Sequence, residues 1–142
     1  MLNFDSSPEP IPQVCVIPFR QNGDRLEFCL ITSLNTQRWI FPKGIVDAGY
    51  GCEEAALNEA REEAGLHGRI VGEPLGTFDD FKWGSPLRVT VLMMEVTGSD
   101  DTWLEADDRE RRWVSSEQAS ELLSKPVLRR FLEAAVARIA EK

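Results

Sequence analysis

Three glutamates near the middle of the chain, Glu59, Glu62 and Glu63, have the residue type and the spacing that metal chemistry needs. Separations of three and four residues place all three carboxylates on one face of a helix. Like charges this close destabilise a helix unless a cation lies among them, and a partly hydrated site of oxygen ligands suits Mg²⁺ or Mn²⁺. Taken alone, three glutamates are better explained as a solvated acidic face with salt bridges from Arg61 or Arg69. The surrounding sequence decides between these interpretations.

Glycines frame the segment that carries the glutamates. The run FPKG at residues 41–44 leads into a predicted loop at residues 44–51, and Cys52–Ala64 has a helix pattern that Gly65 ends as the C′ residue. Read from Gly44, the chain resembles the Nudix box, G-x5-E-x7-R-E-U-x-E-E-x-G-U, in which U is aliphatic. The glutamates therefore resemble part of a known catalytic motif.

Most positions of the box are matched. The matching residues are Gly44, Glu59, Ala60, Glu62, Glu63, Gly65 and Leu66. Two positions depart, because Tyr50 stands where the family has its early glutamate and Asn58 stands where it has arginine. In the family those two side chains support the geometry of the loop and the helix. Losing both together is therefore interpreted as the replacement of one interacting pair.

Motifs outside the box extend the resemblance over about residues 13–132, toward the diphosphoinositol polyphosphate phosphohydrolase branch of the Nudix hydrolases. They are RWIFPKG (residues 38–44), GTF (76–78), WLE (103–105), RERRW (109–113) and KP (125–126). This resemblance implies an α/β fold, the Nudix α/β/α sandwich with a mixed β-sheet. It also implies a hydrolase that cleaves a phosphoanhydride in diphosphoinositol polyphosphates, and often in dinucleoside polyphosphates.

The same resemblance assigns roles to single residues. Glu59, Glu63 and the backbone carbonyl of Lys43 would bind Mg²⁺ or Mn²⁺, and Glu62 would accept the proton of the attacking water. Four cations are candidates for binding substrate phosphates, and scattered surface charge is the alternative for each of them. These candidates are Lys82 and Arg88, together with Arg109 and Lys125, which lie in matched motifs.

Departures from the branch concern the substrate. Residues 10–13 read Pro-Ile-Pro-Gln where the branch has a basic cluster, and Leu34 takes the place of an arginine. Because an inositol pyrophosphate is very densely charged, the loss of these cations favours a nucleotide-linked polyphosphate. Trp83, in a predicted loop, is the candidate for stacking on a base. The other tryptophans, Trp39, Trp103 and Trp113, are more typical of a core.

A second function remains open at this stage. The departures at Tyr50 and Asn58 also fit a Nudix-fold sensor that binds a phosphorylated ligand without hydrolysing it. The three retained glutamates argue against such a non-catalytic module, which would not need them all. Phosphate release with and without a divalent cation separates the two functions.

Composition limits the partners. The chain has 142 residues and a net charge of −8, and it lacks any apolar run long enough to span a bilayer. We expect a flexible proline-rich leader over residues 1–12 and one Nudix hydrolase domain over residues 13–142, as a monomer or homodimer. So acidic a chain is a poor match for nucleic acid or an anionic membrane, and the expected partner is a small di- or polyphosphate. Three cysteines without C-x-x-C spacing indicate reduced thiols in the cytoplasm.

Local patterns predict the elements that position the site. Strands are expected at residues 14–19, 26–32, 39–41, 69–81, 87–96 and 111–114, the last at a sheet edge. Helices are expected at Cys52–Ala64, at residues 115–123, where Ser115 and Gln118 form a capping box, and at residues 127–140. The lone histidine, His67, is expected in a solvated loop. This order predicts a mixed sheet with helices packed on it.

Overall fold

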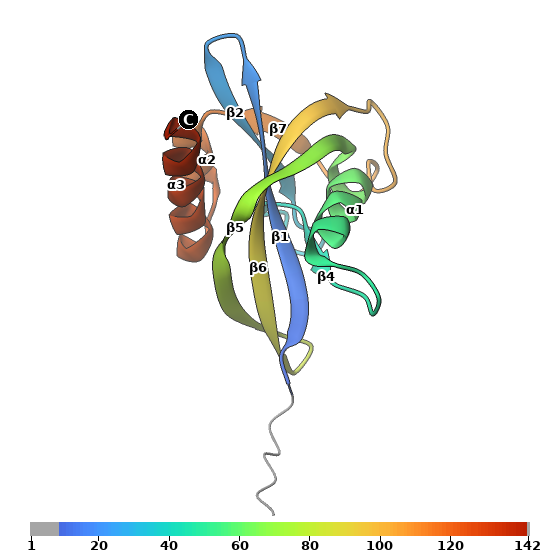
Figure 1. The fold of residues 1–142 in the computed structure, drawn as a ribbon. Helices are drawn as coiled ribbons and strands as arrows, with labels where there is room; N and C mark the ends of the chain where they lie inside the picture. Colours follow the sequence, from blue (N-terminus) through green and yellow to red (C-terminus); the bar gives the residue numbers. More distant parts are fainter. Residues whose placement is uncertain (1–8, 142) are drawn as a thin grey trace, which may run out of the picture.

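A computed structural model describes residues 9–141 of the chain, and Figure 1 shows one sheet with helices on both sides. The part of the chain that it describes contains no helix long and apolar enough to cross a membrane. The elements, in chain order, are β1 (Ile11–Asn22), β2 (Arg25–Thr32), β3 (Trp39–Ile40), β4 (Lys43–Ile45), α1 (Cys52–Ala64), β5 (Leu66–Lys82), β6 (Ser85–Ser99), β7 (Arg111–Val114), α2 (Ser116–Leu122) and α3 (Pro126–Ala140).

The sheet is mixed, as the sequence predicts. Its main path is β3-β2-β1-β6-β5, with β4 added to β1 and β7 added to β2. Strands β1 and β6 run parallel, while the other neighbours run antiparallel. Residues 14–19 of β1 are all buried, because helices cover both faces of this central strand. A strand buried on both faces reads as a continuous apolar run rather than an alternating one.

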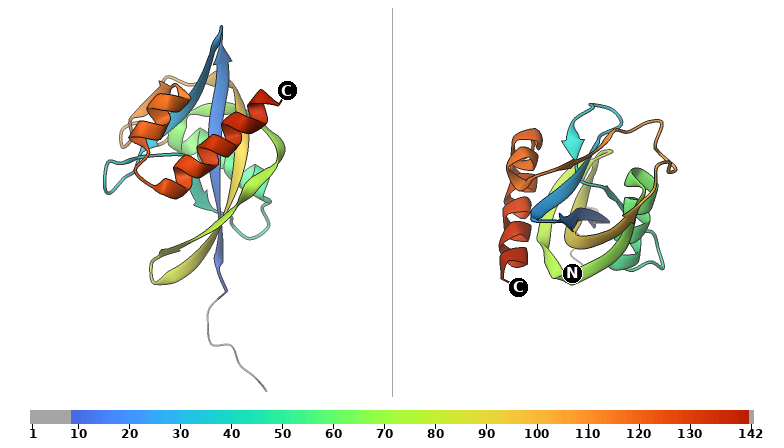
Figure 2. Two further views of the ribbon diagram at one scale, coloured as in Figure 1. Left: turned by 90° about the vertical axis from the view of Figure 1, so that its left-hand side faces the viewer. Right: turned by 90° about the horizontal axis from the view of Figure 1, so that it is seen from above.

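Two separate cores lie on the two faces of the sheet. One joins α1 to alternate residues of β1 and β2, and its alanines, such as Ala56 and Ala60, bring the helix backbone close to the strands. The other packs α2 and α3 against the opposite face through residues such as Leu128 and Leu132. The two views of Figure 2 show α3 lying across the sheet, on the face opposite α1. This confirms the predicted α/β/α sandwich.

Two local expectations are wrong. Strand β4 overlaps the start of the predicted loop 44–51, since Gly44 and Ile45 pair with Val14 and Gln13 of β1. A three-residue strand containing glycine has no pattern of its own. His67 lies in β5 rather than in a loop, and its ring nitrogen Nε2 is 2.7 Å from Asp100. Both pairings depend on distant strands, which a local pattern does not contain.

The ends of the domain differ slightly from expectation. Residues 1–8 of the predicted leader lie outside the described residues, while β1 begins at Ile11, two positions before the expected domain boundary. Pro12 takes part in the sheet through its carbonyl, which accepts a hydrogen bond from the Val46 N–H. Helix α1 has the predicted bounds, and the Ser115–Gln118 capping box at the start of α2 is present.

Candidate active site

A cavity of about 590 Å³ opens where β4, the second half of α1, the tip of the β5–β6 hairpin and the start of α3 meet. We call it the main cavity. Its lining combines five basic side chains with three acidic ones in a chain whose net charge is −8. The basic side chains are Arg38, Lys43, Lys82, Arg109 and Lys125, and the acidic ones are Glu59, Glu63 and Asp80.

The C-terminal end of α1 is fixed by contacts from segment 100–111. Gly65 ends the helix with φ of 67°, a left-handed conformation that favours glycine. The last carbonyls, which have no partner within a helix, accept hydrogen bonds from outside it. The Trp103 indole N–H bonds the Glu63 carbonyl at 2.9 Å, and the Arg111 guanidinium bonds that of Ala64 at 2.7 Å. The turn that carries the glutamates therefore has a fixed position.

Gly44 leaves the space that Glu59 occupies. A Cβ atom added at Gly44 would lie 2.2 Å from the carboxyl carbon of Glu59. Any other residue would displace this carboxylate from its place beside β4. The box glycine is thus required by close approach, not by backbone conformation.

Glu63 is the most enclosed carboxylate of the site. Its Oε1 accepts the backbone N–H of Lys43 at 2.9 Å, and its Oε2 lies 3.4 Å from Nη2 of Arg109. Burial nevertheless outweighs these contacts and raises the pKa of Glu63 to about 8. Burial also raises the pKa of Glu59, a shift to which the neighbouring Glu62 adds. A cation beside both carboxylates would offset this penalty on their charged forms.

The backbone carbonyl of Lys43 is a further candidate ligand for that cation. The even-numbered residues around it bond to β1: the Pro42 carbonyl accepts from the Val16 N–H, and the Val46 N–H donates to the Pro12 carbonyl. Because ladder bonds alternate along an antiparallel strand, the Lys43 N–H and carbonyl point away from β1. The N–H meets Glu63, so the carbonyl faces the same side as the glutamates.

These donors fit a hard divalent cation with an open coordination sphere. No cluster of three or more His, Cys, Asp or Glu side chains suited to a metal occurs among residues 9–141. Mg²⁺ commonly takes only one or two carboxylates from a protein and keeps water and substrate oxygens as its other ligands. Glu59, Glu63 and the Lys43 carbonyl match that need.

Glu62 is separated from the other two glutamates. Its side chain is 39% exposed and lies 3.7 Å from Nη2 of Arg61. It lines a small pocket of about 140 Å³ next to the main cavity, and Glu59 lines both. The helix thus directs two carboxylates into the main cavity and one beside it.

The four predicted phosphate contacts are placed differently. Lys82 and Lys125 line the main cavity, where Lys125 is 3.8 Å from Asp80. Arg109 also lines it, with its side chain only 6% exposed and its Nε bonded to Glu105 at 2.7 Å. Arg88 lies outside the cavity lining and pairs with Asp79 on the surface.

Sequence reasoning missed several side chains of the cavity. The ammonium group of Lys43 faces Lys82 and Lys125, and burial together with these charges lowers the pKa of Lys43. Gln13, Arg38 and Phe81 also line the cavity. Arg38 lies in the matched RWIFPKG motif and could have been found there. Gln13 has no signal of its own in the sequence, where it stands out only as the absence of a cation.

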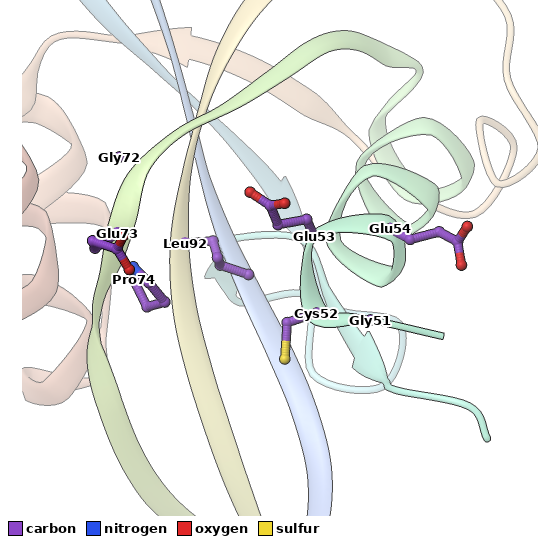
Figure 3. Close-up of a pocket in the computed structure, with 8 residues that line it drawn as sticks. All are labelled: Gly51, Cys52, Glu53, Glu54, Gly72, Glu73, Pro74 and Leu92. Atoms are coloured by element: carbon purple, nitrogen blue, oxygen red, sulfur yellow. The ribbon is translucent and has the colours of Figure 1, made fainter. Parts of the chain in front are cut away.

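A second cavity of about 570 Å³ lies between the first turn of α1 and β5 (Figure 3). Its lining contains three carboxylates, Glu53, Glu54 and Glu73, and Figure 3 shows Glu54 directed away from the strands. Without a basic side chain in its lining, this cavity is unsuited to a phosphate. The main cavity therefore remains the candidate active site.

Comparison with known proteins settles the family. The model of the NUDIX domain matches residues 9–135. The chain belongs to the Nudix family. Among curated Nudix relatives, it is 32% identical to "Nudix hydrolase 13, mitochondrial" of Arabidopsis thaliana, over 84% of this chain and 64% of that one. It is 30% identical to "Diphosphoinositol polyphosphate phosphohydrolase 3-alpha" of Mus musculus, over 81% of this chain and 71% of that one.

Solved Nudix structures share the fold. A C. elegans Ap4A hydrolase in a binary complex superposes with a TM-score of 0.79 at 24% identity, covering 93% of this chain and 99% of that one. The chain spans less than two thirds of the first plant relatives it matches, 64% and 58% of their lengths.

The two departures from the Nudix box lie together. Tyr50 and Asn58 both line the small pocket beside the main cavity, with Glu59 and Glu62. The Asn58 side-chain oxygen accepts a hydrogen bond from Arg61 at 3.0 Å, while Tyr50 is 49% exposed. The positions of the family's Glu–Arg pair therefore remain neighbours here, although their charges are gone.

Proposed function

We propose that the protein is a metal-dependent Nudix pyrophosphohydrolase, which cleaves a phosphoanhydride in a nucleotide-linked polyphosphate or a diphosphoinositol polyphosphate. The observation that carries this proposal is the lining of the main cavity. It contains two carboxylates with raised pKa, the buried Glu63 and the partly buried Glu59, together with Lys43, Lys82 and Lys125. The carboxylates suit a divalent cation, and the lysines suit a chain of phosphates.

Mg²⁺ or Mn²⁺ is the proposed cofactor, held by Glu59, Glu63 and the Lys43 carbonyl. Such a cation polarises phosphoryl oxygens and lowers the pKa of bound water. The protein itself holds the carboxylates in position. Arg109 and the Lys43 N–H hold the Glu63 carboxylate in place, and Gly44 admits that of Glu59.

The phosphates of the substrate are proposed to lie against Lys43, Lys82 and Lys125. Three ammonium groups around one aspartate, Asp80, leave a local positive charge in an acidic protein. The pKa of Lys43 is lowered, first by burial and then by the charges of Lys125 and Lys82, so an anion beside these lysines would be favourable. Arg109 touches the phosphate site from the buried side, and Arg88 is a weaker candidate because it lies outside the cavity lining.

Glu62 is the proposed proton acceptor. Water attacks phosphorus, the phosphorus–oxygen bond to the leaving phosphate breaks, and the proton of the water passes to the carboxylate. Support comes from its position, since Glu62 is partly exposed, adjoins Glu59 and is held only by a 3.7 Å ion pair with Arg61. Its carboxylate is therefore free to change partners.

The partner and the compartment are part of the proposal. We expect a small di- or polyphosphate as the only substrate class, with neither nucleic acid nor membrane as a partner, and a monomer or homodimer in solution. A reducing cytoplasm fits Cys15, Cys29 and Cys52, which are all free thiols in the structure. Burial raises the pKa of Cys15 and Cys29 to about 12, which keeps both thiols protonated.

A substrate panel tests the proposal. Phosphate release is measured with dinucleoside polyphosphates, ADP-ribose, nucleoside triphosphates and diphosphoinositol polyphosphates, each with Mg²⁺, with Mn²⁺ and with a chelator. We expect cation-dependent release from at least one polyphosphate. Tight binding of a polyphosphate without release under any cation would instead identify a non-catalytic sensor, the alternative that Tyr50 and Asn58 suggest.

A further inference from the structure

The loop of the β5–β6 hairpin contains an aromatic residue in an unfavourable conformation. Lys82 pairs with Ser85, so the loop has two residues, Trp83 and Gly84, with φ of 55° and 71°. Positive φ at both loop positions defines a type I′ turn, in which Asn, Asp or Gly is preferred at the first position. A bulky side chain there is strained.

The hairpin joining β1 and β2 provides a comparison within the same molecule. Its first loop residue also has positive φ, of 63°, and that residue is Gly23. A hairpin of this chain can therefore be closed without strain. Strain kept at one loop and avoided at another is a reason to look for function at the strained one.

The strained tryptophan is not used in packing. Trp83 is 63% exposed and Phe81 is 67% exposed, and both line the main cavity. Within the protein, Trp83 is accompanied by Lys82, whose ammonium lies 4.8 Å from the ring centroid. Two largely exposed aromatic rings thus line the cavity, and the Trp83 ring has the Lys82 ammonium over one face, which leaves the other for a ligand.

An independent observation comes from the floor of the same cavity. Gln13 is only 4% exposed and lines the main cavity. Among residues 9–141, its Oε1 is the one buried side-chain oxygen or nitrogen without a hydrogen-bond partner. A buried acceptor without a donor is costly, so such an atom in a binding cavity indicates a ligand that supplies one. Phosphate oxygens of an anhydride only accept, whereas nucleobase N–H and ribose O–H groups donate.

We propose that Phe81, Trp83 and Gln13 form a subsite for the nucleoside part of the substrate, which makes a nucleotide-linked polyphosphate the substrate class. This rests on the proposed hydrolase function for its phosphate site. The aromatic rings stack on the base, because every base offers a flat π face. Gln13 accepts a hydrogen bond from the nucleoside. The site can thereby distinguish a nucleotide-linked ligand from one made of phosphates alone. An inositol ring has no flat face to stack.

The test uses Trp83→Asn and Gln13→Met. Asn is favoured at the first position of a type I′ turn, and Met replaces the orphaned amide with an apolar group of similar length. Each variant should therefore melt at or above the wild-type temperature. Its KM for diadenosine tetraphosphate should rise, about tenfold for the loss of stacking and about fivefold for Gln13→Met. Its KM for a diphosphoinositol polyphosphate should change less than twofold.

Leu104→Asn is the matched control, because Leu104 is 76% exposed and lies outside the cavity lining. It should change neither KM. An equal rise in KM for both substrates in Trp83→Asn and Gln13→Met would overturn the proposal. A lower melting temperature without any change in KM would overturn it too, and would leave the hairpin a structural element. Turnover of the diphosphoinositol substrate alone would overturn it too, while the hydrolase function stood.

A binding experiment separates this subsite from catalysis. Adenosine monophosphate is titrated into wild-type protein and both variants, and binding is followed by calorimetry. Weaker binding by the variants supports the subsite even if no polyphosphate is hydrolysed, in which case the proposed function fails alone. Equal binding by all three proteins, or none by the wild type, overturns the subsite.

Discussion

Glu63 and Arg109, on the inner wall of the main cavity, have side chains less than one-tenth exposed, whereas Phe81 and Trp83, at the hairpin tip, are about two-thirds exposed. The inner wall is made of Glu59, Glu63, Arg109 and the Lys43 backbone, and in it both Glu63 and Arg109 have several protein partners. At the hairpin tip, Trp83 has a contact with the Lys82 ammonium, and both aromatic rings are otherwise largely exposed to solvent. Chemistry tolerates little displacement, so the wall that would perform it is fixed from several directions. Recognition instead needs surface left free for the ligand.

Replacing the carboxylates of the inner wall should have the largest effect. Glu63→Gln and Glu59→Gln keep the shape of the side chain and remove the charge of a proposed metal ligand. Turnover should fall by about 10³-fold, because a metal contributes several kcal/mol to the transition state. Glu54→Gln, on the exposed side of α1, is the control. Near-wild-type turnover of Glu63→Gln at low Mg²⁺ would refute the ligand assignment.

The pH dependence of stability should report the burial of Glu63. Its pKa is raised from 4.5 to about 8 in the folded protein, so between these values the folded state holds a proton that the unfolded chain releases. The contribution of this proton to the stability of the chelator-treated protein should therefore be full below pH 4.5 and be lost as the pH rises through 8. Chemical unfolding at several pH values should show a weaker fall for Glu63→Gln. Identical slopes would mean that Glu63 is ionised when folded.

Arg109→Ala should destabilise the protein by on the order of 3 kcal/mol, because it leaves the buried Glu63 and the partly buried Glu105 without a cation. The side chain contacts Glu63 and Glu105 and donates to the Thr32 carbonyl at 2.8 Å. Arg88→Ala is the control, since its pair with Asp79 is exposed and should contribute less than about 1 kcal/mol. Urea unfolding measures the loss of stability in both variants. Equal losses would mean that the ion pairs of the inner wall contribute no more to stability than an exposed pair.

Glu62→Gln should lower the rate by about 10²-fold at saturating metal, the usual contribution of a general base. More cation does not replace a proton acceptor, whereas Glu59→Gln and Glu63→Gln should recover part of their activity as Mn²⁺ is raised. Equal rescue of all three would identify Glu62 as another ligand. Glu105, which pairs with Arg109 beside the site, would then be the next candidate base, ahead of Glu95, which pairs with the exposed Arg69.

The smallest effect is expected in the pocket next to the inner wall. Tyr50→Glu and Asn58→Arg should each lower activity: the first adds a carboxylate beside Glu59 and Glu62, and the second adds a cation there without the family's glutamate to hold it. The double variant should restore the family's ion pair. It should therefore lose less activity and stability than the two single variants lose together, with a coupling of about 0.5–3 kcal/mol. Activity and urea unfolding of all four proteins measure it. Additivity would mean that the two side chains do not meet.

The fold was predictable because its patterns are long. The alanines and glutamates of α1 repeat at helical spacing, and the central strands read as apolar runs, so the layers could be assigned before any contact was known. Strand β4 could not be predicted, since Gly44 is a strand residue only through its pairing with Val14. His67 was misplaced for the same reason.

The candidate site was predictable in its residues but only partly in its geometry. Spacing predicts Glu59, Glu62 and Glu63 on one helix face, yet Glu62 lines the small pocket instead of the main cavity and lies 3.7 Å from Arg61. Their roles remain predictions. Gln13 could not be found from sequence, because a lone glutamine in a strand has no pattern, and its importance comes only from burial without a partner.

The parallel pairing of β1 with β6 has a consequence for how the protein reaches its folded state. Cys15 in β1 lies opposite Val91 in β6, 76 residues further along the chain. Contacts so distant in sequence close late and slow the search for the native topology. During synthesis, β1, β2 and α1 leave the ribosome before β6 exists, so β1 then has an unpaired, apolar edge. The nascent chain is therefore most prone to aggregate in that interval, before the main cavity can form.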